Sequence, residues 1–161
     1  MNIRPATFED IRFIAELEKS CPTAAHWSEQ SYRDSIAGSG FPERVILVAE
    51  ACREPSSPVR GSDATRISAF LVARHVASEW ELENIVVAPT VRRVGLGRQL
   101  LHVLLQRARE TNSSSVFLEV RESNAAARKL YEKLGFDRIG RRSSYYSAPF
   151  EDAVLYRLEL P

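Results

Sequence analysis

Apolar residues recur every three or four positions in several stretches of the chain, a spacing that is typical of amphipathic helices. In the first stretch, Thr7 and Asp10 are spaced like a helix-capping residue and its partner. Ser28 stands where its hydroxyl could cap the second. The pattern predicts helices over residues 5–19, 28–36, 95–110 and 123–135.

The other apolar runs are short and rich in β-branched and aromatic residues, as is typical of strands. They predict strands over residues 44–51, 67–76, 79–89, 114–120, 136–146 and 152–160. Between the first two strands, the prolines, glycine and serines of residues 52–66 indicate a loop. A loop of that length is either functional or loosely ordered, and the sequence leaves the role of Arg53–Thr65 open.

Helices come first in this order, then strands, and then strands that alternate with helices. The order predicts an α/β (α+β) fold, with a single mixed sheet of about six or seven strands and helices on both faces. The unit from Leu82 through Val120 should be a right-handed crossover that joins two parallel strands. Because no repeat or linker interrupts the pattern, we expect residues 1–161 to form a single domain.

The composition is that of a soluble globular protein, with 44% hydrophobic and 27% charged residues. A net charge of +1 argues against general nucleic-acid binding, which usually needs a strong basic excess. RNA binding stays open as a weaker alternative because arginines cluster within residues 92–98 and 138–142. No apolar run approaches the roughly 18 residues of a membrane span, and the start lacks a signal-peptide core. We therefore expect a cytoplasmic protein with no membrane partner.

The cysteines and histidines show no pattern that indicates a metal site. Cys21 and Cys52 have neither metal-ligand spacing nor a disulfide framework, and His26, His75 and His102 are scattered along the chain. We expect structural or surface roles for these residues, and no metal. Since neither cysteine lies in a catalytic-looking context, no acyl-enzyme is expected.

The stretch from Arg92 to Arg98, RRVGLGR, combines two glycines with three arginines between a predicted strand and a predicted helix. The first N–H groups of a helix have no partner within the helix, and glycines leave room for an anion to approach them. The segment therefore predicts an anion site. It is not a P-loop, because Arg98 and Gln99 follow Gly97 where that motif needs Lys and Ser or Thr. It is not a Rossmann fingerprint either, because Leu100 replaces the third glycine.

The pattern R-x-x-G-x-G over Arg92–Gly97 resembles the acetyl-CoA pyrophosphate loop of the GNAT superfamily of N-acetyltransferases. Within that superfamily, residues 82–101, 118–136 and 141–160 are similar to the RimI-type enzymes, which acetylate the N-terminal alanine of a small-subunit ribosomal protein. The resemblance implies a GNAT-like acyl-CoA N-acyltransferase fold with a mostly antiparallel sheet. It also implies a peptide α-N-acetyltransferase that uses acetyl-CoA and acts on the N-terminus of a protein substrate.

In this family the pantetheine arm lies along the strand before the loop, and the pyrophosphate binds loop N–H groups. Asn124 matches a residue that contacts the cofactor, although a plain helix cap explains it equally well. The implied cofactor-binding residues are Ile85, Val86, Val87, Arg92, Arg93, Val94, Gly95, Leu96, Gly97, Arg98 and Asn124.

Acetyl transfer needs a base that takes a proton from the amine and an acid that protonates the departing thiolate. Glu119 matches the base proposed for the family, and by strand alternation it shares a face with Phe117. Tyr131 matches the acid, although a tyrosine on the same helix face as Leu130 and Leu134 is more often a core residue. The resemblance thus implies the catalytic pair Glu119 and Tyr131.

An α-amine with a pKa of about 8 is easier to deprotonate than a lysine side chain at about 10.4, which is compatible with N-terminal acetylation. Tyr145 and Tyr146 match a tyrosine pair on the acceptor side of the family, and Trp27 matches a tryptophan that could line the acceptor channel, although packing is the more usual role of such a residue. The sequence departs from the family in its long loop, and in RRSSYY, which replaces a more usual asparagine before the tyrosine pair. A lysine side chain or small amine as acceptor stays open, as does a non-catalytic module that binds CoA.

Overall fold

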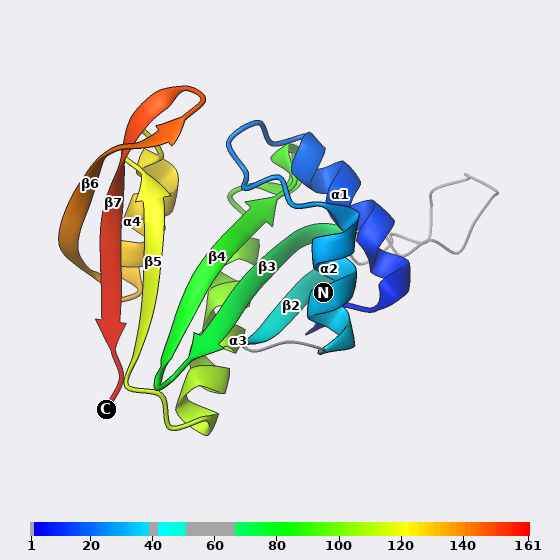
Figure 1. The fold of residues 1–161 in the computed structure, drawn as a ribbon, viewed down its shortest axis with the longest axis horizontal. Coiled ribbons are helices and arrows are strands. Elements are labelled where there is room, and N and C mark those ends of the chain that lie inside the picture. Colours follow the sequence, from blue (N-terminus) through cyan, green and yellow to red (C-terminus); the bar gives the residue numbers. More distant parts are fainter. Residues whose placement is uncertain (1, 39–41, 51–66) are drawn as a thin grey trace. The chain divides into compact units, whose positions relative to one another are not determined.

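The computed structural model describes residues 2–38, 42–50 and 67–161 (Figure 1). Cys52 and the predicted loop around Arg53–Thr65 lie outside the described residues. In chain order the elements are β1 (Asn2–Pro5), the short 3-10 helix η1 (Phe8–Asp10), α1 (Ile11–Lys19), α2 (Glu29–Ala37), β2 (Glu43–Glu50), β3 (Ile67–Val76), β4 (Glu79–Val87), η2 (Pro89–Val91), α3 (Leu96–Glu110), β5 (Ser115–Arg121), α4 (Ala125–Lys133), β6 (Asp137–Ser147) and β7 (Phe150–Glu159).

The strands form one 7-stranded sheet in the order β1-β2-β3-β4-β5-β7-β6. The β1–β2, β5–β7 and β6–β7 pairs are antiparallel, whereas β4 and β5 are parallel, from Glu79↔Ser115 to Leu82↔Leu118. The predictions of a mixed, mostly antiparallel sheet and of a parallel pair around α3 are confirmed. The order predicted for the start of the chain is wrong, because β1 precedes the first helix. Four residues that end in a proline fit an edge strand but give no clear periodic signal.

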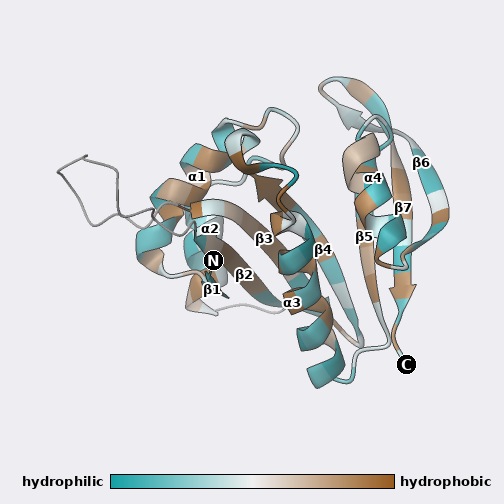
Figure 2. Cartoon of the chain, turned by 180° about the vertical axis from the view of Figure 1, so that it is seen from behind, coloured by the Kyte–Doolittle hydropathy of each residue, from teal (hydrophilic) through white to brown (hydrophobic). Residues whose placement is uncertain are grey.

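The chain divides into two compact units, Met1–Val72 with Asn84–His102 and Ala73–Glu83 with Val103–Pro161. In the first unit, α1 and α2 lie on one side of β2 and β3, and the start of α3 lies on the other side (Figures 1 and 2). Apolar residues of α1 and α2 pack against the facing side chains of the strands, and this core includes Ile11, Ile14, Leu17, Tyr32, Ile46, Val48, Phe70 and Val72.

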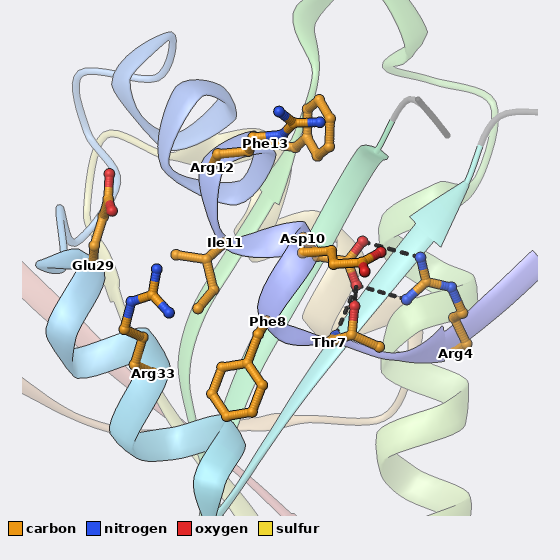
Figure 3. A pocket seen from close by; sticks show the side chains of 10 residues that line it. Arg4, Thr7, Phe8, Asp10, Ile11, Arg12, Phe13, Glu29 and Arg33 are labelled. Carbon is orange, nitrogen blue, oxygen red and sulfur yellow. Dashed lines mark hydrogen bonds and ion pairs between the residues drawn. The ribbon is translucent and has the colours of Figure 1, made fainter. Parts of the chain in front are cut away.

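The start of α1 is fastened to β1 by an ion pair that the sequence did not predict. Asp10 is buried, and its Oδ2 accepts hydrogen bonds from the Thr7 N–H at 2.7 Å and from Arg4 Nη1 at 2.6 Å (Figure 3). Burial by itself would raise the pKa of Asp10, but the hydrogen bonds from Arg4 and Thr7 outweigh it and lower that pKa. The predicted pairing of Thr7 with Asp10 is confirmed, and Arg4 joins it.

In the second unit, β5 pairs with β7 over its whole length, and α4 contacts β7 through Tyr156, whose hydroxyl donates to Glu132 at 2.6 Å. The fourth predicted helix is confirmed, with Asn124 as its N-cap. Gly135 follows the helix at φ +90°, a left-handed backbone that favours glycine.

Candidate active site

The predicted anion loop lies in the first unit, where β4 ends at Val87 and α3 begins at Leu96. Arg93 and Gly95 both have left-handed backbones, with φ of 69° and 88°. These two residues reverse the chain, and the first intrahelical bond then runs from the Gln99 N–H to the Gly95 carbonyl at 3.0 Å. The N–H groups ahead of Gln99 therefore fall in the first helical turn, where no helical carbonyl precedes them.

Gly95 is needed for its backbone conformation and leaves open space around it. A Cβ atom added there would meet nothing within 4 Å among the residues that the structure describes, so none of their atoms excludes a side chain. The left-handed φ nevertheless disfavours any L-residue with a side chain. Open space beside first-turn amides suits the approach of a phosphate group.

The Arg92 side chain is bonded to protein atoms of the same unit. Its Nε donates to the Val87 carbonyl at 3.2 Å, and its Nη2 donates to the Cys21 Sγ at 3.5 Å. Cys21 is buried and directly follows the C-terminal end of α1. Arg92 thus ties the loop to the end of β4 and to the segment that follows α1. The sequence does not predict the second contact, because Arg92 and Cys21 are 71 residues apart. Arg98 is exposed and donates from Nε to His102 Nε2 at 3.2 Å.

The strand end before the loop alternates in burial, with Val86 in the core and Ile85 and Val87 half-buried. The Ala88 N–H continues the strand edge by donating to the Ser68 carbonyl at 2.8 Å. The backbone of residues 85–87 is therefore extended, as a strand-like ligand would require.

Glu119 lies on β5 in the second unit, and its side chain is only 13% exposed. Its Oε1 is 3.1 Å from the Nε of Arg142, an exposed residue of β6. Glu119 raises the pKa of the Tyr145 hydroxyl, first by accepting from it and then, after the effect of burial, by its negative charge. The structure thus brings Glu119 and Tyr145 together as neighbours and adds Arg142 to them. Sequence reasoning grouped Arg142 only with a basic cluster.

Tyr145 and Tyr146 contact each other edge to face, with ring centroids 5.1 Å apart. Arg121 lies over the Tyr146 ring at 4.1 Å and Arg142 over the Tyr145 ring at 5.4 Å. Burial, followed by the charge of Glu119, raises the pKa of Tyr146 to about 12. Both phenols are therefore neutral near pH 7.

Tyr131 is buried in the second unit, with 3% of its surface exposed. Its ring packs against Phe136 and Tyr156, so it does occupy the core position that its helix face predicts. Burial, followed by the electrostatic effect of Tyr146, raises the pKa of the Tyr131 hydroxyl well above its usual value. The phenol is protonated at neutral pH and could donate a proton or a hydrogen bond.

Asn124 caps α4, and its Oδ1 accepts from the Ala127 N–H at 3.2 Å. The structural role considered from sequence is therefore present, and its side chain lies at an exposed position.

Trp27 is half-buried in the first unit, 5.7 Å from the Tyr32 ring and under the Arg44 guanidinium at 5.4 Å. The backbone N–H of Trp27 donates to Oε2 of Glu18 at 3.0 Å, while the Tyr32 hydroxyl donates to Oε1 at 2.9 Å. Glu18 is 2% exposed and also accepts from Asn84 on β4 at 2.8 Å. This buried carboxylate holds the α1–α2 connection against β4. The sequence does not predict its burial, because glutamates are usually exposed.

Trp27 also lines a cavity of about 690 Å³, together with Ser28, Ser31, Asp34 and Arg44 among others. Within the described part of the chain, no group of three or more His, Cys, Asp or Glu residues could hold a metal ion. In the same residues, no helix has the length and apolar character to span a membrane.

Comparison with known proteins identifies relatives of the chain. The profile of the acetyltransferase (GNAT) family matches residues 11–136. A [ribosomal protein bS18]-alanine N-acetyltransferase from Escherichia coli strain K12 is 40% identical over 97 residues, 59% of this chain and 66% of the relative. The match thus spans slightly less than two thirds of that relative's length.

Solved structures share the fold. The ribosomal-protein-S18-alanine N-acetyltransferase from Escherichia coli superposes with a TM-score of 0.73 and 29% identity, covering 98% of this chain and 92% of that one. Arabidopsis thaliana NAA60 in complex with acetyl-CoA gives a TM-score of 0.81, with 99% and 98% coverage. At 16% identity, the second likeness concerns the fold alone.

The backbone of Gly95 provides a test of the loop geometry. Gly95→Ala should lower the free energy of unfolding by about 1 kcal/mol, because alanine is strained in a left-handed backbone. Gly95→Asn should lose clearly less, since asparagine tolerates this conformation. Urea denaturation of both variants and the wild type measures the difference. Equal stability of the alanine and asparagine variants would contradict the assigned conformation.

Proposed function

Since the chain belongs to the acetyltransferase (GNAT) family, we propose that it transfers an acetyl group from acetyl-CoA to the N-terminal α-amine of a protein. The proposed acceptor is the N-terminal alanine of a small-subunit ribosomal protein, as the name of the 40% identical relative states for that enzyme. The observation that carries the proposal is the glycine turn at the start of α3, which follows an extended strand and opens first-turn amides to an anion.

The residues of the loop fit a diphosphate. The amides from Arg93 through Arg98 would donate to its oxygens, and the space around Gly95 leaves room for it. Arg92 would not contact the diphosphate but would hold the loop in place through its bonds to Val87 and Cys21. The extended backbone of residues 85–87 would bond the amide groups of the pantetheine arm as an added strand does. Asn124 would contact the cofactor with the part of its amide that does not cap α4.

Glu119 and Tyr131 would supply the proton transfers. The acceptor nitrogen forms a bond to the thioester carbonyl carbon, and Glu119 takes the proton that the nitrogen loses. The carbon–sulfur bond then breaks, and the Tyr131 hydroxyl gives its proton to the thiolate. Trp27, Tyr145 and Tyr146 would line the path of the acceptor. The protonated state of Tyr131 at neutral pH supports its role as the acid.

The acceptor is tested by incubating the protein with acetyl-CoA and four kinds of amine. These are a peptide that starts with alanine, its Nα-acetylated twin with an internal lysine, a polyamine, and a purified ribosomal small subunit. Intact-mass analysis and peptide mapping should find one added acetyl group on the α-amine of the free peptide and on one protein of the subunit. Acetylation of the lysine or the polyamine alone would contradict the proposal, and no acetylation of any acceptor would favour a CoA-binding module.

The catalytic roles are tested by Glu119→Gln and Tyr131→Phe. Each should lower kcat by about 10²- to 10⁴-fold, because each removes one proton transfer, while the affinity for acetyl-CoA by calorimetry stays close to that of the wild type. Glu122→Gln and Tyr156→Phe are the matched controls, since they lie in the same unit and carry no proposed role in proton transfer. Turnover of both test variants equal to that of their controls would show that the assignment is wrong.

A further inference from the structure

The carboxylate of Glu119 is already engaged by a cation of the protein itself. Its side chain is 13% exposed, whereas the side chain of its partner Arg142 is 53% exposed. An anion that is mostly covered is thus paired, at 3.1 Å, with a cation that reaches it from the surface. Water can solvate the half-exposed guanidinium when it leaves, whereas the covered carboxylate then needs another cation in its place.

A bulge in β6 sets the position of this cation. The register shifts between Arg142, which lies opposite Ala153, and Tyr146, which lies opposite Glu151. Within the bulge, Ser144 has φ +52°, and its N–H donates to Oδ1 of Asp152 at 2.7 Å. The bulge falls within the RRSSYY segment, residues 141–146, so it separates Arg142 from the tyrosine pair.

A second contact, with the ring of Tyr145, positions Arg142 beside Glu119. Its guanidinium lies 5.4 Å from the centre of the Tyr145 ring, which limits where the guanidinium can lie beside the carboxylate. Arg121, the other arginine near the tyrosine pair, is paired with Glu151 at 3.3 Å and stacked on Tyr146. It is therefore engaged elsewhere. Arg142 is the cation that the fold directs to Glu119.

A free α-amine near pH 7 is mostly a cation, because its pKa is about 8. The α-ammonium group should pair with the carboxylate of Glu119, which is to take its proton. In the free protein the Arg142 guanidinium pairs with that carboxylate. The two cations differ in one respect that matters for the reaction. An arginine does not lose its proton in proteins and cannot act as a nucleophile, whereas the α-ammonium group can lose its proton and attack.

We propose that Arg142 is a stand-in for the acceptor: its guanidinium pairs with Glu119 in the free enzyme and yields that carboxylate to the incoming α-ammonium group of the substrate. This inference rests on the proposed function, in which Glu119 is the base. Arg142 is thus a specificity-determining residue that competes with the acceptor. Only a ligand that brings its own positive charge to Glu119 displaces it, so an acetylated N-terminus has no means of doing so. Product release is thereby favoured.

The test uses Arg142→Gln, with Arg138→Gln as the matched control. Both variants remove one positive charge from exposed positions of β6, and only Arg142 pairs with Glu119. The protein is saturated with CoA, which carries no acetyl group, so that peptides bind without reacting. Calorimetry then measures the Kd of an alanine-started peptide and of its Nα-acetylated twin.

Arg142→Gln should bind the free-amine peptide about threefold more tightly than the wild type, as expected when a half-exposed cation no longer competes for the carboxylate. Arg138→Gln should leave its Kd unchanged, Arg142→Lys should restore the wild-type value, and the acetylated twin should bind all variants alike. The proposal is overturned if Arg142→Gln binds the free amine no more tightly than Arg138→Gln does, or if the acetylated twin gains the same factor.

The same measurements separate this inference from the proposed function. If the wild type prefers the free amine and Glu119→Gln abolishes both that preference and turnover, the proposed role of Glu119 stands whatever Arg142 does. If the wild type binds the free and acetylated peptides equally and Glu119→Gln turns over normally, the proposed function fails, and the role of Arg142 fails with it.

Discussion

Between the end of β4 at Val87 and the start of α3 at Leu96, the chain passes through η2 and then through the left-handed backbones of Arg93 and Gly95. All proposed chemistry depends on this turn, because it determines where the first amides of α3 point. Arg92 adds a second constraint by tying the turn to Val87 and Cys21. An anion site made of main-chain amides needs no particular side chain at its surface, which explains why the motif is so short.

The second unit contributes polar groups of a different kind. A pyrophosphate site can be formed by amides that do not change charge, but an acetyl transfer needs groups that exchange protons. The sheet supplies the carboxylate of Glu119, and α4 supplies the buried, neutral hydroxyl of Tyr131. The β6 bulge then brings Arg142 and Tyr145 to the carboxylate, so the charge of Glu119 is balanced before any substrate arrives. The acceptor amine would therefore replace the positive charge of Arg142 beside Glu119, because that carboxylate is already paired in the free protein.

Periodicity and capping residues predicted most of the fold, because strands such as β3 and helices such as α4 are short-range patterns that need no tertiary information. The edge strand β1 was missed, since four residues carry too little pattern. The site was predicted where a local motif defines it, as in the loop from Arg92 to Gly97. The partners of its residues were not predicted: Cys21 is 71 residues from Arg92, and Arg142 meets Glu119 only through the register of β5, β7 and β6. Such contacts depend on strand order, which single-sequence patterns do not determine.

The central claim is that main-chain amides at the start of α3 hold the diphosphate of the coenzyme. Amide NMR of the isotopically labelled protein, titrated with CoA and separately with pantetheine, tests it most directly. We predict that the N–H resonances of residues 93–98 shift strongly with CoA and hardly at all with pantetheine, which lacks the diphosphate. Saturable binding of CoA that leaves those resonances unmoved would contradict the account.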